Sequence, residues 1–335
     1  MLYIRADMNK QIATGHIMRC LSIADAFRTI GESVIFMLAD EQAVDLLKQR
    51  GYDAVVLHTE WNHMEEELPV LKQVIDQYSM DQLLIDSYQV TETYLAALSG
   101  WVKTTYIDDL NMFEYPVDAI ICYANYWKKF GYQINKKEKK YYLGTQYVPL
   151  RQAFWNCEKK IISETADKLL ILTGGSDPYN ISEQILSSID PGKFQNIDVI
   201  CGVYNTNYEQ LLIKYANLAN VKFHRAVNDI EKYMQAADIV ISAGGTTLYE
   251  LCACGTPAIS YAFADNQLDN VRQFKEDGLI DYAGDARQDD IAGNINQYLN
   301  QYRTNSRLRK DRSERMQKMV DGKGAMRLAE VLMQF

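Results

Sequence analysis

The feature that most constrains the fold is a regular alternation of short apolar runs with longer amphipathic stretches. Residues 2–6 and 34–38 are apolar runs typical of buried strands, and residues 16–30 between them have helical periodicity. Alternation of this kind indicates a parallel sheet whose two faces are covered by helices. We therefore predict an α/β protein in which strands and helices follow one another along the chain.

The alternation is interrupted once and then starts again, which predicts two domains. In the first half it predicts strands at residues 2–6, 34–38, 54–57, 83–85, 104–107 and 119–122, and helices at 16–30, 41–50, 64–78 and 91–99. In the second half it predicts strands at residues 168–172, 197–201, 221–224, 238–241 and 258–261. The second-half helices are expected at 181–189, 208–216, 230–236, 247–254 and 266–276, with further helix over 289–335.

The interruption itself contains two kinds of segment. Residues 127–142 are rich in lysine and tyrosine and are predicted to be exposed and mostly irregular; the lysines are Lys128, Lys129, Lys136, Lys137, Lys139 and Lys140. Residues 156–166 are the expected linker. We therefore place the domains at 1–155 and 156–335, with the option that the last helix packs back on the first domain. Two doubly wound, Rossmann-like domains in tandem are typical of the GT-B architecture, in which they face each other across a cleft.

Composition excludes several classes of function. The net charge of −9 would repel the phosphates of a nucleic acid. No apolar run is long enough to span a bilayer, and residues 2–6 fit a strand better than a signal peptide, so we expect a cytoplasmic protein. The six cysteines and four histidines are scattered without metal-ligand spacing, so we expect no metal and no disulfide.

The most informative turn follows the apolar run at residues 238–242. Gly244 and Gly245 allow a sharp turn, and the pattern becomes helical from Thr247. A strand, a glycine turn and a helix start leave several backbone N–H groups pointing at one place, where the helix dipole favours an anion such as a phosphate. Thr247 and Glu250 also match a capping box, which requires no ligand, so both interpretations stay open.

Two further glycine turns follow predicted strands. Thr14-Gly15-His16 opens a helix in the first half, and Gly174-Gly175 follows the strand at 168–172. In open α/β sheets the ends of such strands face the ligand. None of the three turns matches the full dinucleotide or P-loop fingerprint, so we expect neither an NAD nor an ATP site and no other cofactor.

His16 is the leading catalytic candidate. It lies at the predicted start of a helix, where the dipole favours a neutral imidazole, and a neutral histidine beside a phosphate site can act as a general base toward water. The alternative is a histidine that only hydrogen-bonds a neighbouring loop or only binds phosphate. Asp86, Asp108 and Asp109 end predicted strands, where carboxylates contact sugars or water or simply form turns.

In the second half, three side chains are suited to a nucleotide sugar. Glu250 can accept both hydroxyls of a ribose if it is not used in the capping box. Asn266 and Gln267 offer the donors and acceptors that hydroxyl and acetamido groups require. Helix capping by Asp265 is the alternative role of this segment.

In these residues the chain resembles the UDP-sugar hydrolases of pseudaminic acid biosynthesis, and the resemblance covers nearly its whole length. That family is related to the GT-B transferase that adds N-acetylglucosamine in peptidoglycan synthesis. The resemblance rests on residues 4–7, 11–20, 107–110, 143–144, 149–151, 174–178, 242–247, Glu250, 266–267 and 321–325. Its most specific element is Thr14-Gly15-His16-Ile17-Met18-Arg19, because the related transferases differ there.

The resemblance implies hydrolysis of UDP-2,4-diacetamido-2,4,6-trideoxy-β-L-altropyranose to the free sugar and UDP, without a metal ion. It implies that His16 is the base for a water that attacks the anomeric carbon with inversion, and that Glu250 binds the ribose. The residues implied to contact the substrate or UDP are Gly15, Arg19, Asp86, Gly174, Ser176, Val227, Gly245, Thr246, Thr247, Glu250, Asn266 and Gln267.

Four features of the first domain depart from the family pattern. Ala13 stands where a glycine is usual, Ser87 replaces the histidine after Asp86, residues 111–115 lack the usual basic side chains, and Asn125 is also unusual. The related spore-coat polysaccharide proteins share this variation, so another deoxy-amino hexose stays open. The competing functions are a GT-B glycosyltransferase that uses a UDP-amino sugar donor, and a non-catalytic nucleotide-sugar binding protein. The expected partner is the UDP-sugar alone, with no nucleic acid, membrane span or obligate protein partner.

Overall fold

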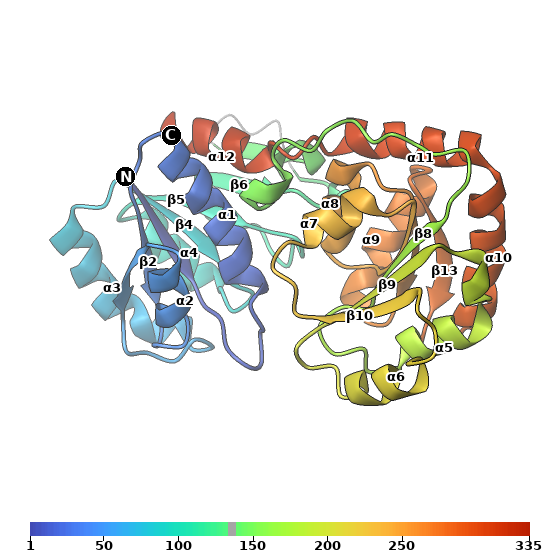
Figure 1. Ribbon diagram of the computed structural model, residues 1–335. Helices are drawn as coiled ribbons and strands as arrows, with labels where there is room; N and C mark the ends of the chain where they lie inside the picture. The colour runs from blue at the N-terminus through green and yellow to red at the C-terminus, as the bar shows by residue number, and fades with distance from the viewer. Residues whose placement is uncertain (133–138) are drawn as a thin grey trace. The chain divides into compact units, whose positions relative to one another are not determined.

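The computed structural model describes residues 1–132 and 139–335. The chain divides into two compact units, which Figure 1 shows in a ribbon view. Unit 1 comprises residues 1–152 together with 323–335, and unit 2 comprises residues 153–322. Each unit is built on a parallel sheet with helices on its faces, as the alternation of apolar and amphipathic stretches predicts.

Unit 1 contains a seven-stranded sheet in the order β3-β2-β1-β4-β5-β6-β7. Its strands are β1 (Leu2–Ala6), β2 (Val34–Leu38), β3 (Asp53–Val56), β4 (Gln82–Asp86), β5 (Lys103–Ile107), β6 (Ala119–Cys122) and β7 (Lys140–Leu143). Its helices are α1 (Gly15–Thr29), α2 (Val44–Gln49), α3 (Met64–Tyr78), α4 (Glu92–Ser99) and α12 (Gly324–Met333). Three single-turn 3-10 helices lie at Trp127–Phe130, Thr145–Tyr147 and Gln152–Phe154, the last across the boundary with unit 2.

The prediction that residues 127–142 are mostly irregular is wrong at the end of that segment. Lys140–Leu143 forms β7, which pairs in parallel with β6. This strand was missed because it lies at the sheet edge, where its residues are exposed or only partly buried and form no apolar run. Lys136 and Lys137 lie outside the described residues.

Unit 2 contains a six-stranded sheet in the order β10-β9-β8-β11-β12-β13. Its strands are β8 (Lys168–Leu172), β9 (Asn196–Cys201), β10 (Val221–Arg225), β11 (Ile239–Ala243), β12 (Ala258–Ala262) and β13 (Ile280–Asp285). Its helices are α5 (Ile181–Ser188), α6 (Tyr208–Lys214), α7 (Ile230–Ala236), α8 (Thr247–Cys254), α9 (Asp265–Glu276), α10 (Ile291–Thr304) and α11 (Ser306–Met319), with a 3-10 turn at Pro191–Lys193. The edge strand β13 was not predicted, because Asp281 and Gly284 interrupt its apolar pattern.

Both faces of the unit 1 sheet are buried. Tyr3, Leu83 and Ile85 belong to a core shared with α3 and α4, and the intervening strand residues Ile4 and Leu84 are also fully buried. On the first strands α1 packs against β1 and β2, and α12 packs against α1. The last helix therefore completes unit 1, and both chain ends lie on this unit (Figure 1).

The strand pairs in both sheets are parallel, so in each sheet the carboxyl ends of all strands lie at the same edge. The turns that the sequence analysis selected follow these carboxyl ends. In the described residues no helix is long and apolar enough to cross a bilayer.

Candidate functional site

In unit 1 the fold brings His16, Arg19 and Asp86 together. Asp86 is the last residue of β4, and β4 lies beside β1 with Ala6 opposite Asp86. The chain leaves β1, turns, and starts α1 at Gly15, so that His16 and Arg19 lie one helical turn apart above the same strand ends. Two side chains on the same face of α1, His16 and Arg19, therefore both contact Asp86.

Asp86 is the centre of this cluster. Its Oδ1 lies 2.7 Å from His16 Nδ1, and both of its oxygens accept from the guanidinium of Arg19 through Nε and Nη2. The side chain of Asp86 is fully buried, and those of His16 and Arg19 are 7% and 12% exposed. A buried carboxylate held by two donors of an arginine is an ion pair with fixed geometry.

The electrostatics keep this carboxylate ionised. Burial by itself would raise the pKa of Asp86, but the charge and hydrogen bonds of Arg19, with a contribution from His16, hold that pKa well below its usual range. An ionised carboxylate can only accept, so the contact with Asp86 requires a proton on His16 Nδ1, although Arg19 Nη2 also lies 3.1 Å from this nitrogen. In a neutral imidazole with this tautomer the lone pair is on Nε2. The arrangement presents a base on one ring nitrogen while the other is anchored.

Three further residues surround the cluster, and none of them was selected as a site residue from the family resemblance. Tyr88 lies edge-on to the His16 ring with centroids 4.6 Å apart, and its hydroxyl donates to Asp109 Oδ2 at 2.9 Å. Arg19 Nη1 donates to the Tyr123 hydroxyl at 2.9 Å and lies 3.4 Å from Asp109 Oδ2. Each follows the carboxyl end of a strand, the signal that singled out Asp109 in the sequence and that could also have found Tyr88 and Tyr123.

The two neighbouring carboxylates Asp108 and Asp109 have different roles. Asp108 is buried and accepts from the N–H groups of Leu110 and Asn111 and from the hydroxyl of Tyr115, so it is the turn former that the alternative interpretation describes. Asp109 instead faces Arg19, and its Oδ1 is buried with no hydrogen-bond partner in the described residues.

In unit 2 the turn after β11 has the predicted strand, glycine turn and helix. A Cβ on Gly244 would lie 2.1 Å from Val271 Cγ1, so only glycine fits there. A Cβ on Gly245, by contrast, would meet open space. The helix begins at Thr247, whose N–H is among the first N–H groups that lack an intrahelical partner in any helix.

The capping-box alternative for this turn is wrong. The N-cap of α8 is Thr246, in helical rather than extended conformation and with no side-chain cap hydrogen bond. A capping box requires a carboxylate at the third helical residue after the N-cap. With Thr246 as the N-cap, Glu250 is the fourth helical residue. The turn is instead held by Asn270, which sequence reasoning missed: its Nδ2 donates to the carbonyls of Gly244 and Gly245, and its Oδ1 accepts from the Tyr249 hydroxyl.

The neighbouring strand ends carry the other selected residues of unit 2. Gly174 and Ser176 are exposed in the turn after β8, which lies beside β11, and Gly174 adopts a φ of 80°. Asp177 in the same turn is buried and accepts from the N–H groups of Ile181 and Ser182, which fixes the start of α5. Val227 follows β10, two strands from β8, so it is the most distant of the set.

Asn266 and Gln267 start α9, after β12 on the other side of β11. Asn266 is exposed, whereas Gln267 Oε1 accepts from the Phe263 N–H at 3.0 Å and is used to hold the turn. The N-cap of α9 is Ala264, so the capping role considered for Asp265 is wrong; Asp265 forms an ion pair with Arg287 at 2.7 Å.

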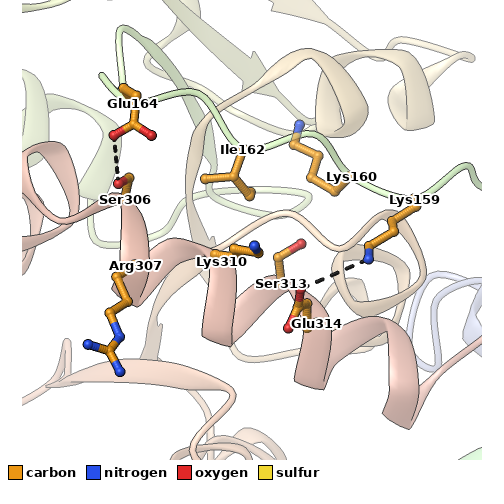
Figure 2. Close-up of a pocket in the computed structure, with 9 residues that line it drawn as sticks. All are labelled: Lys159, Lys160, Ile162, Glu164, Ser306, Arg307, Lys310, Ser313 and Glu314. Atoms are coloured by element: carbon orange, nitrogen blue, oxygen red, sulfur yellow. Dashed lines mark hydrogen bonds and ion pairs between the residues drawn. The ribbon is translucent and has the colours of Figure 1, made fainter.

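A pocket of about 410 Å³ lies elsewhere in unit 2, between residues 159–164 and α11 (Figure 2). Lys159, Lys160, Arg307 and Lys310 give it a basic lining, and Lys159 lies 3.9 Å from Glu314. It contains none of the selected residues. Over the described part of the chain, no three His, Cys, Asp or Glu side chains are grouped to hold a metal ion.

A family model described as "Glycosyl transferases group 1" matches residues 192–318, which lie within unit 2. It covers less than half of the chain. The match includes the turn at Gly244–Gly245 and the start of α9, so the region of similarity contains the turn geometry described above.

Curated relatives have related but different descriptions. The chain is 25% identical to a Bacillus subtilis protein named spore coat polysaccharide biosynthesis protein SpsG, over 57% of each chain. It is 32% identical to a Helicobacter pylori UDP-N-acetylglucosamine–N-acetylmuramyl-(pentapeptide) pyrophosphoryl-undecaprenol N-acetylglucosamine transferase, over 43% of this chain and 42% of the relative. It is also 27% identical to a Helicobacter pylori pseudaminic acid cytidylyltransferase and UDP-2,4-diacetamido-2,4,6-trideoxy-beta-L-altropyranose hydrolase, over 43% of this chain and 26% of that protein.

The matches span 57%, 42% and 26% of the length of these three relatives, so the chain covers little more than half of any of them. Among solved structures, MurG of Acinetobacter baumannii superposes with a TM-score of 0.73, covering 100% of this chain and 99% of that one at 11% sequence identity. Identity at this level establishes the architecture and not the activity. Together with the two parallel sheets, these findings show that the chain has the two-domain GT-B fold.

Proposed function

We propose that this chain is an enzyme that hydrolyses a UDP-linked diacetamido-trideoxyhexose to the free sugar and UDP, with His16 as the general base. The observation that carries the proposal is the contact of 2.7 Å between His16 Nδ1 and the buried carboxylate of Asp86. A base that is oriented in this way needs no rotation of the imidazole before it accepts a proton. Arg19 keeps Asp86 in place, and so the orientation is fixed by an ion pair rather than by a loop.

In the proposed reaction, a water molecule gives one proton to His16 Nε2 while its oxygen attacks the anomeric carbon of the sugar. The bond between that carbon and the β-phosphate oxygen breaks, and UDP leaves with the electron pair. Attack from the side opposite the leaving group inverts the anomeric centre. Asp86 does not take the proton; it stabilises the imidazolium that forms, as a buried carboxylate does in a hydrolytic triad.

Unit 2 is assigned the nucleotide. The turn at Gly244–Gly245 and the first N–H groups of α8 suit a diphosphate, since glycine permits close approach and the helix start carries partial positive charge. Glu250, in the first turn of α8, is assigned the ribose hydroxyls. Donors of this kind that face the leaving group each contribute about 3 kcal/mol to transition-state stabilisation in well-studied hydrolases.

A glycosyltransferase with the same donor is the second candidate. The family model over residues 192–318 and the N-acetylglucosamine transferase relative favour it. The two candidates differ only in what the base activates, a water or an acceptor hydroxyl. The small exposed edge of His16, partly covered by Tyr88, favours a small nucleophile such as water.

The test is release of UDP in the absence of an acceptor. The purified chain is incubated with UDP-linked diacetamido and N-acetylamino hexoses in plain buffer, and UDP is measured alongside UDP binding by calorimetry. We expect release that is lost in His16→Ala and kept in His63→Ala, a matched control because the His63 side chain is 59% exposed. UDP binding should survive in both variants and weaken in Glu250→Ala.

The outcomes separate the candidates. Release only when an acceptor sugar is added supports the transferase and rejects the hydrolase. UDP binding without turnover under either condition leaves only a nucleotide-sugar binding protein. Loss of stability with unchanged UDP affinity in Glu250→Ala would remove the ribose assignment.

A further inference from the structure

Cys157 and Cys254 form a contacting thiol pair in unit 2. Their sulfurs lie 3.8 Å apart although the residues are 97 positions apart in the chain. Cys157 belongs to the irregular segment after the unit boundary and is partly exposed, whereas Cys254 is the last residue of α8 and is buried. At this distance the two sulfurs are in van der Waals contact, so either thiol can reach the other without a rearrangement of the chain between them.

The segment that carries Cys157 is held against the end of α8 by Gln317 of α11. Gln317 Nε2 donates to the carbonyls of Glu158, at 2.9 Å, and Ala253, at 3.3 Å. Its Oε1 accepts from the Lys160 N–H at 3.3 Å. One side chain thus ties the residues on either side of the thiol contact together, so that the pair is fixed rather than a chance approach of two surface loops.

A second set of contacts fixes the same segment to α7. Lys160 Nζ donates to the carbonyls of Gln235 and Ala237 at the end of that helix. Gln235 Nε2 lies 3.3 Å from Cys157 Sγ and donates to it. The Cys157 sulfur therefore accepts from one neutral donor and touches a second thiol, which is a setting that favours its thiolate.

We propose that Cys157 and Cys254 are a thiol modification site, which low-molecular-weight disulfides oxidise to an intramolecular disulfide between the two residues. In this reaction Cys157 is the attacking thiol because it is the exposed member of the pair. Cys254 is the resolving thiol. Neither cysteine is assigned to the nucleotide sugar above, although Cys254 ends the helix that carries Glu250.

The two steps conserve atoms and electrons. The Cys157 thiolate attacks one sulfur of the small disulfide, whose S–S bond breaks, and one small thiolate leaves with the bonding electrons. The sulfur of Cys254 then attacks Cys157 Sγ and expels the second small thiolate, which takes up the proton that Cys254 gives up. The pair of protein thiols is oxidised by two electrons, and one small disulfide is reduced to two thiols.

The remaining cysteines lack this setting. Hydrogen bonds from Cys254 and Gln235 lower the pKa of Cys157 to about 7, against the raising effect of burial. Burial raises the pKa of Cys201 to about 11 and that of Cys122 to about 12. Cys20 and Cys252 are fully buried. At neutral pH the reactive thiolate is therefore on Cys157.

The test uses the full chain and oxidised glutathione as the probe. After incubation at neutral pH, free thiols are alkylated in acid and the chain is analysed by intact mass and by peptide mapping. We expect a product lighter than the reduced chain by two hydrogen atoms, with one disulfide that links the peptides of Cys157 and Cys254. The midpoint of thermal unfolding should rise in this product, because the cross-link restricts the unfolded chain, and it should return after reduction.

Single-serine variants separate the roles. Cys254→Ser should stop the reaction at a mixed disulfide on Cys157, and Cys157→Ser should give neither product. Cys201→Ser, which removes a buried thiol outside the pair, should form the same cross-link as the unsubstituted chain. The proposal is overturned if glutathione remains on Cys157 when Cys254 is present. It is equally overturned if the folded chain gives no product while the chain unfolded in urea reacts.

Discussion

Unit 1 buries two arginines against carboxylates, and the difference between the two clusters is instructive. In the first, Arg5 donates to both oxygens of Glu67 and to Asp7, with the Arg5 and Glu67 side chains fully buried. In the second, Arg19 donates to both oxygens of Asp86, beside His16. Both arginines approach a buried carboxylate with two nitrogens, so burial and pairing alone do not distinguish the clusters.

What distinguishes them is how completely the polar atoms are used. In the Arg5 cluster, Tyr94 donates to Glu67 Oε1 and the Ala39 N–H donates to Asp7 Oδ1. The Arg19 cluster opens to the surface through Tyr88, which is 40% exposed, and it leaves Asp109 Oδ1 without a partner in the described residues. A buried charge network that is closed serves stability, whereas one that is partly open and holds a histidine is suited to bind and react.

The largest expected effect comes from breaking the closed cluster. In Arg5→Met, Glu67 and Asp7 lose their cation while they remain buried, which should lower the free energy of unfolding by about 3–5 kcal/mol. Urea unfolding followed by circular dichroism measures this loss. The double variant Arg5→Met/Glu67→Leu should regain part of it, because it removes one uncompensated charge; a double variant less stable than the single one would contradict this account.

The second largest effect is expected in the Arg19 cluster, where a substitution should lower the rate of UDP release. Asp86→Asn removes the negative charge that orients His16, so the rate of UDP release should fall about 100-fold or more, the range of an oriented general base. UDP affinity, measured by calorimetry, should stay unchanged, because the nucleotide is assigned to unit 2. A rate within about threefold of the unsubstituted chain would show that Asp86 does not position the base.

The pH dependence of stability follows from the same carboxylate. The pKa of Asp86 in the folded chain lies well below its value of about 4 in an unfolded chain. Its contribution to stability is therefore present above about pH 4 and is lost as the pH falls below that value, because the unfolded chain then binds the proton first. Denaturant unfolding at several pH values should show the stability difference between the unsubstituted chain and Asp86→Asn shrinking on acidification. A difference independent of pH would exclude this role.

The parts of this fold that could be predicted from the sequence are those with a local signal. Central strands such as β1 and β11 are continuous apolar runs, and the helices between them have clear periodicity, so the alternation and the GT-B order could be predicted. The edge strands β7 and β13 could not be predicted, because the residues of β7 are exposed or only partly buried and Asp281 and Gly284 break the apolar pattern of β13. At the turn after β11, a shift of the helix start by a single residue removes the capping box that the spacing of Thr247 and Glu250 suggests.

The site was predictable only residue by residue. His16, Arg19 and Asp86 could be selected individually, but their contact depends on β4 lying beside β1 rather than beside β3, which is a property of the sheet order. Asn270 gives no local signal at all, since it looks like an ordinary helix residue until the glycine carbonyls lie against it. Such roles depend on residues that are close in the fold but distant in the sequence, so no local sequence pattern predicts them.

The smallest expected effect gives the sharpest comparison, because the same substitution can be made in both clusters. Tyr94→Phe removes a buried donor at 2.6 Å from Glu67, and loss of a hydrogen bond to a charged group should lower the free energy of unfolding by about 1.5–3 kcal/mol. Tyr88→Phe removes a donor to Asp109 where water can replace it, so the loss should be below about 0.5 kcal/mol. Parallel urea unfolding of the two variants measures the difference. Equal losses would mean that the second cluster is as closed as the first, and the exposed position of Tyr88 would then no longer mark the side from which a substrate reaches His16.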